Sequence, residues 1–129
     1  MLDRIDIHIE VPRLQRDELT GPPSGEGSAA IRGRVAGARL LQSERLSGTG
    51  VYCNAHLRAR QVQHFCHVRD DARALLCAAI TQMSLSARAY DRILKLARTI
   101  ADLAGVEEIG VAHVAEAVQY RALDRKLWG

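Results

Sequence analysis

The first apolar residues of the chain alternate strictly with polar ones. In residues 5–11, isoleucine or valine occupies every odd position and Asp6, His8 and Glu10 occupy the even ones. This period of two is typical of a strand with one buried face. No second segment shows a comparable pattern, and an isolated strand leaves its backbone groups unpaired. We therefore predict an orphan β-strand over residues 1–12, which pairs either with a second copy of the chain or with a sheet in a longer polypeptide.

The strand pattern ends at Pro12, and residues 13–27 include the Pro/Gly-rich stretch "TGPPSGEG". This composition predicts a flexible loop. The next segment, from Ser28 to about residue 46, reads as a helix with one apolar face. Gly33 and Gly37 lie inside it, and each costs about 1 kcal/mol relative to alanine. A short helix is also expected to end near His64.

Three stronger helical patterns follow. Asp70 is expected to cap the first, which has apolar residues at the i, i+3, i+4, i+7 spacing of an amphipathic helix. Ser86 is expected to cap the second, and Gly105 to end it. The last is predicted from about Val111 to Arg121. The sequence thus predicts a mainly α fold, a small helical bundle over residues 28–129 preceded by the orphan strand.

Composition agrees with one small helical domain. The chain has 129 residues, of which 47% are hydrophobic but only 4% aromatic, and its formal net charge is +3. Such a charge is compatible with nucleic acid without requiring it. No apolar run approaches the roughly 18 residues of a membrane span, and the charged start excludes a secretory signal. The three cysteines are too few and odd in number for a disulfide framework, so a reduced, cytoplasmic setting is expected.

Catalytic and metal-binding motifs are weak. Six cysteines and histidines crowd residues 53–77, yet only Cys53 and His56 have a spacing suited to one metal. Zinc sites need paired ligands at close spacing, so no metal site is expected. Neither a phosphate-binding glycine loop nor a nucleophile elbow is present in the sequence.

Basic residues remain as candidates. Arg88 falls in the first turn of a predicted helix, where a cation opposes the helix dipole. Arg92, Lys95 and Arg98 follow opposite the apolar stripe. They form either a solvated face, with Asp91 and Lys95 as an ion pair, or a weak nucleic-acid contact. For Arg4, which lies beside Asp3 and Asp6, one interpretation is likewise that it only neutralises its neighbours.

Several stretches together resemble a known family. These are "LDRIDIHIEVP", "SAAIRGRV", "NAHL", "LSARAYDRILKLARTIADL" and "HVAEAVQYRALDR". In this order they resemble the C-terminal portion of the Mg-chelatase-like AAA+ ATPases of the ComM type, over essentially the whole chain. The resemblance implies a helical lid following a P-loop ATPase core, in a hexameric ring that uses ATP and Mg.

The resemblance also implies roles for two arginines. Arg4 in "LDR" occupies the position of the arginine finger, which reaches the ATP of a neighbouring subunit. Arg88 in "SAR" occupies the sensor-2 position. A positioned arginine stabilises the charge that develops during phosphoryl transfer. Relatives of this type are expected to act on DNA, in branch migration during recombination and natural transformation.

The chain lacks the Walker A, Walker B and sensor-1 segments of that family. It is therefore expected to be part of a longer protein. By itself it is expected to hold no cofactor and to hydrolyse no ATP. Its expected partner is the ATPase core of the same protein, and no contact with a membrane is expected. Two alternatives stay open. One is a non-enzymatic helical module that binds DNA or protein, and the other is a magnesium-chelatase-type subunit that assists metal insertion into a porphyrin.

Overall fold

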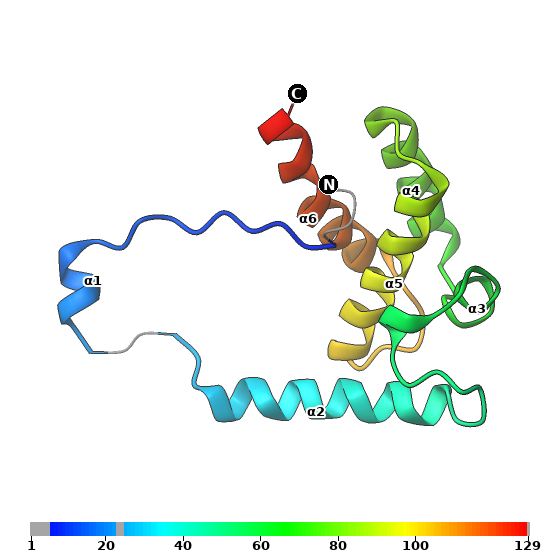
Figure 1. Ribbon diagram of the computed structural model, residues 1–129, viewed down its shortest axis with the longest axis horizontal. Coiled ribbons are helices and arrows are strands. Elements are labelled where there is room, and N and C mark those ends of the chain that lie inside the picture. Colours follow the sequence, from blue (N-terminus) through cyan, green and yellow to red (C-terminus); the bar gives the residue numbers. More distant parts are fainter. Residues whose placement is uncertain (1–5, 23–24, 129) are drawn as a thin grey trace.

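The computed structural model describes residues 6–22 and 25–128, with side chains as far as Arg121. Its described part is helical (Figure 1), which confirms the predicted mainly α bundle. The elements in chain order are α1 (Arg16–Thr20), α2 (Ser28–Arg45), the 3-10 turn η2 (Asn54–His56), α3 (Ala59–Phe65), α4 (Asp70–Met83), α5 (Ala87–Leu103) and α6 (Val111–Trp128).

Helix α5 is the centre of the bundle. It packs against α6, α2, α3 and η2, while α4 packs against α6. Leu76 of α4, Ile93 of α5 and Val114 of α6 are fully buried between these helices. Because burying such a side chain stabilises a fold by roughly 1.5–3 kcal/mol, the shared core fixes the relative positions of α4, α5 and α6.

Local signals set the ends of α5 as the sequence predicts. The Ser86 hydroxyl accepts a hydrogen bond from the backbone N–H of Ala89 at 3.2 Å. Gly105 has a φ of +70° just after the helix, a conformation that favours glycine. The N-terminus of α4 differs from expectation, because Arg69 is the capping residue and Asp70 lies in the first turn. There its carboxylate still faces the positive end of the helix dipole.

The last helix also differs in part from its prediction. It runs on to Trp128 rather than ending near Arg121. Its buried residues include Val114 and Ala117, whereas Val111 is 41% exposed. The buried face of α6 therefore includes Ala117 and leaves Val111 outside it.

The predicted strand lacks the partner that it requires in the described part of the chain, and it does not form there. Residues 6–15 are irregular, and the chain forms no strand among its described residues. The physical reason is the absence of a partner segment within this part of the chain. The segment instead makes single contacts, as where the backbone N–H of His8 donates to the carbonyl of Tyr120 at 3.1 Å. Within the predicted loop, residues 16–20 form the short helix α1, which the composition did not indicate.

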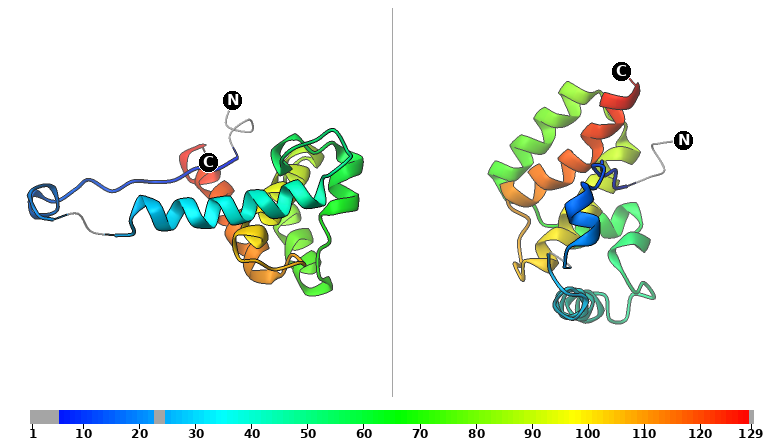
Figure 2. Two further views of the ribbon diagram at one scale, coloured as in Figure 1. Left: turned by 90° about the horizontal axis from the view of Figure 1, so that it is seen from below. Right: turned by 90° about the vertical axis from the view of Figure 1, so that its left-hand side faces the viewer.

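Helix α2 has the predicted bounds but only part of it packs. Its buried residues are Ala38 and Gln42, while Ile31 and Val35 on the predicted apolar face are 43% and 48% exposed. Figure 2 shows the N-terminal half of α2 extending away from the other helices. Helix α2 is thus attached to the bundle mainly through its C-terminal half.

Candidate functional site

Arg88, the expected sensor-2 residue, lies in the first turn of α5. Its side chain is exposed, and it makes no hydrogen bond or ion pair within the described part of the chain. The helix beneath it is firmly held, because Ala89 and Ile93 are buried in the core. Arg4, the expected arginine finger, lies outside the described residues.

Arg92 and Lys95, on the next turns of α5, face a small pocket. The pocket has a volume of about 170 Å³ and is lined by residues of the N-terminal segment, η2 and α5. Arg92 Nη1 lies 3.5 Å from the carboxylate of Asp6. Lys95 Nζ donates to the carbonyl of Ala55 at 3.3 Å. Both cations therefore have partners within the chain, and the predicted contact between Asp91 and Lys95 is replaced by the one to Ala55.

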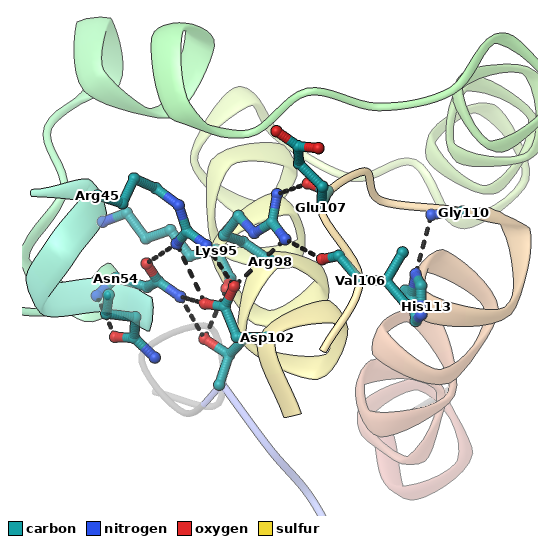
Figure 3. Close-up of polar contacts among 11 residues, drawn as sticks. Arg45, Asn54, Lys95, Arg98, Asp102, Val106, Glu107, Gly110 and His113 are labelled. Carbon is teal, nitrogen blue, oxygen red and sulfur yellow. Dashed lines mark hydrogen bonds and ion pairs between the residues drawn. The ribbon is translucent and has the colours of Figure 1, made fainter. Parts of the chain in front are cut away.

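Arg98 does not lie on a solvated face, so that prediction is wrong. Its residue is 2% exposed, and so is Asp102. Arg98 Nη2 lies 3.2 Å from the carboxylate of Asp102, and the guanidinium donates to the carbonyls of Val106 and Glu107 at 2.8 and 2.6 Å. A buried guanidinium needs such partners. Figure 3 shows these contacts, which tie the loop after α5 back onto the helix.

The carboxylate of Asp102 is the centre of a wider polar network (Figure 3). Arg45, in the last turn of α2, donates to both of its oxygens. The side-chain amide of Asn54 in η2 donates to Asp102 at 2.9 Å and to Thr99 at 3.0 Å. One carboxylate thus joins α2, η2 and α5.

Burial and neighbouring charges shift the pKa values of Arg98 and Cys66. Burial lowers the pKa of Arg98, while the neighbouring carboxylate of Asp102 acts in the opposite direction. Burial also raises the pKa of Cys66 to about 11. The Cys66 thiol is therefore protonated at neutral pH and is a poor nucleophile or metal ligand.

The cysteines and histidines of residues 53–77 form no cluster. Cys53 Sγ lies 3.5 Å from Nδ1 of His56, as their spacing suggests. Among the described residues, however, no three potential ligands gather at one point. None of the helices in the described part is both long and apolar enough to cross a bilayer.

The sequence contained one overlooked signal for the network. Asp102 is the second-last residue of α5, and a carboxylate at that end of a helix opposes the dipole. Arg98 comes four residues before Asp102, so its cation lies on the same side of the helix and can compensate the carboxylate. Nothing in the local pattern indicated Arg45 or Asn54, which reach Asp102 through tertiary contacts.

Comparisons with known proteins agree on one family. The family model for "magnesium chelatase, subunit ChlI C-terminal" matches residues 25–121. Competence protein ComM of Haemophilus influenzae is 42% identical over 98% of this chain, and protein YifB of Escherichia coli is 37% identical over 98%. This chain spans 24% of the length of each of these relatives. The chain therefore belongs to the family of the C-terminal domain of magnesium chelatase subunit ChlI and of ComM-like proteins.

Proposed function

We propose that the chain is the helical lid of a Mg-chelatase-like ring ATPase and supplies arginines for ATP hydrolysis. In this proposal Arg88 is the sensor-2 residue and Arg4 is the arginine finger, which reaches a nucleotide held by a neighbouring subunit. ATP and Mg bind the core of the whole protein, which is a hexamer. A positioned guanidinium lowers the barrier by stabilising charge on the transferring phosphoryl group.

The state of Arg88 is the observation that carries this proposal. The side chain is exposed near the N-terminus of a helix, where the dipole disfavours a cation. Its neighbours along the same side of α5 are held differently, since Arg92 and Lys95 have partners within the chain. A rigid helix therefore presents one guanidinium to the outside, as binding of a phosphate requires.

The contact between Asp6 and Arg92 supports a joint role for the two arginines. It attaches the N-terminal segment to α5 one helical turn after Arg88. Asp6 is two residues from Arg4 in the sequence. Arg88 therefore lies one helical turn from the point where the described part of that segment contacts α5.

Exposed apolar side chains support a further partner, the ATPase core of the same protein. Most of the large exposed hydrophobic side chains in the described chain fall between residues 7 and 41. They include Ile9 at 67%, Val11 at 81% and Leu14 at 57% exposure. The gathering of these side chains in one stretch of the chain supports a partner that covers them, and the relatives have about three quarters of their length outside this region.

We further propose that the whole ATPase acts on DNA and drives branch migration during recombination and natural transformation. The name of the Haemophilus relative, a competence protein, supports this choice. The family description, which names magnesium chelatase, supports the alternative of a subunit that assists metal insertion into a porphyrin.

A chimera tests the ATPase role. This chain replaces the matched quarter of Haemophilus ComM, and steady-state ATP hydrolysis is measured. We expect Arg88→Ala to lower kcat by about 10²-fold, the usual effect of losing one preorganised donor, and Arg4→Ala by about 10³-fold or more. Arg73→Ala, which removes an exposed arginine from α4, is the matched control and should leave kcat unchanged.

Thermal unfolding of each chimera separates a loss of activity from a loss of structure. Wild-type kcat in both Arg88→Ala and Arg4→Ala would overturn the proposal. So would an equal fall in the Arg73→Ala control.

A further inference from the structure

Positive charge is concentrated in one part of the chain. Residues 28–65 contain six arginines and a single acidic residue, Glu44, which gives a net charge of +5. The rest of the chain has a net charge of −2. These residues form α2, η2 and α3, so the charge is concentrated in the part of the chain that precedes α4.

We propose that this surface, the α2–α3 basic surface, binds the phosphate backbone of double-stranded nucleic acid. It is defined by Arg32 and Arg39 of α2 and Arg60 of α3. All three side chains are exposed, and none makes a hydrogen bond or ion pair within the described part of the chain. The inference stands independently of the ATPase role of Arg88.

The sequence pointed to a different surface for this contact, on α5. That surface is poorly suited, because Arg98 is buried against Asp102. Arg92 and Lys95 would first have to give up Asp6 and the carbonyl of Ala55. The arginines of the α2–α3 basic surface can bind phosphate without breaking any such contact.

The spacing along α2 fits a phosphate backbone. Arg32 and Arg39 are seven residues apart, so they lie on nearly the same side of the helix and about 10.5 Å apart along its axis. A duplex advances by about 10 Å along its axis over three base-pair steps. Two arginines at this separation on one side of α2 can therefore reach phosphates of the same duplex.

The shape of α2 makes this side accessible. Only Ala38 and Gln42 of its residues are buried, and the N-terminal half projects from the bundle (Figure 2). Figure 1 shows the C-terminal end of α2 leading through a loop into η2 and α3. Arg60, which is exposed on α3, adds a further positive charge to the segment that follows α2.

Acidic neighbours pair with Arg34 and Arg45 but leave the charges of Arg32 and Arg39 in place. Glu26 lies just before α2, but its carboxylate is paired with Arg34. Glu44 is five residues from Arg39, which turns it about 140° away around the helix. A nucleic-acid backbone approaching Arg32 and Arg39 therefore meets a locally positive surface.

The partner chemistry follows from what the surface contains. Arginine forms bidentate hydrogen bonds with phosphate oxygens. No aromatic side chain lies on α2, so the stacking that single-stranded binding uses is absent from this helix. The expected interaction is with the backbone of a duplex and is independent of base sequence.

Fluorescence anisotropy with the whole chain and a labelled 30-base-pair duplex of mixed sequence tests the proposal. We expect binding at 50 mM salt that weakens as salt rises, because counterions are released. Arg32→Gln with Arg39→Gln should weaken binding by roughly tenfold and reduce the salt slope by about 2. The matched control is Arg13→Gln with Arg73→Gln, which makes the same change in net charge at exposed sites elsewhere.

Three results would overturn the proposal. They are no binding of the duplex at 50 mM salt, an equal weakening by the two double variants, and equal affinity for poly-glutamate of the same charge. The last would identify an acidic protein surface as an equally good partner. Because no ATP is involved, the result is separate from that of the Arg88 experiment.

Discussion

Two arginine–carboxylate pairs show how differently the two parts of the molecule use charge. In the bundle, the Arg98 and Asp102 side chains are 2% and 0% exposed and join further partners. At the projecting N-terminal half of α2, the Arg34 and Glu26 side chains are 50% and 46% exposed and form an ion pair only with each other. A buried ion pair strongly penalises the loss of one partner, whereas an exposed pair is screened by water. Charge therefore specifies structure in the bundle and is available for binding on α2.

The largest expected effect comes from breaking the buried pair. Asp102→Ala leaves Arg98 and Arg45 buried or half-buried without their carboxylate, and should lower the free energy of unfolding by about 3–5 kcal/mol. Glu26→Gln removes the exposed carboxylate and should produce no measurable change. Urea denaturation at pH 7, followed by circular dichroism, measures both.

A conservative variant sharpens this test. Asp102→Asn keeps the size and one acceptor oxygen but removes the charge, so its unfolding midpoint should lie between those of the wild type and Asp102→Ala. Equal midpoints for Asp102→Ala and Glu26→Gln would show that the two pairs do not differ as burial implies.

The buried thiol of Cys66 gives the next effect, which depends on pH. Its pKa is raised from 9.0 to about 11 by burial, so the folded state retains the proton that the unfolded state loses above pH 9. Its contribution to stability is therefore complete below pH 9 and lost as pH rises toward 11, by on the order of 2 kcal/mol.

Urea denaturation between pH 8 and 11 measures this loss. Other groups also titrate in that range, so the quantity of interest is the difference from Cys66→Ala, which has no thiol at this position. Cys77→Ala, at an exposed cysteine of α4, should keep the wild-type slope. Parallel curves for the wild type and Cys66→Ala would contradict the prediction.

The smallest effect is expected in the projecting part. An added Cβ at Gly33 meets no atom within 4 Å, so Gly33→Ala should stabilise α2 by up to about 1 kcal/mol. Amide hydrogen exchange should slow within the N-terminal half of α2, while the unfolding midpoint of the bundle stays constant. Gly105→Ala, where φ is +70°, should instead lower that midpoint. A higher bundle midpoint in Gly33→Ala would show that the whole of α2 unfolds with the bundle.

Local signals in the sequence were sufficient for most of the helical elements. The periodic apolar residues of α4 and α5, the Ser86 cap and the Gly105 stop all depend on residues close in the chain. The position of Arg88 in the first turn of α5 followed in the same way.

Tertiary contacts account for the errors. Arg98 and Asp102 have the charge of a surface face, and only the approach of Arg45 and Asn54 makes their burial favourable. The alternation in residues 5–11 describes side-chain faces but supplies no partner strand, so the described part of that segment is irregular.

The bond between Arg45 and Asp102 has a mechanical consequence. It joins the last turn of α2 to α5. A tilt of α2 about its C-terminal end would therefore strain the contact between Arg45 and Asp102. With 18 residues the helix is a lever arm of about 27 Å, and a tilt of ten degrees corresponds to about 5 Å at its tip. A force applied to the far end of α2 is therefore delivered, with leverage, to the helix on which Arg88 is mounted.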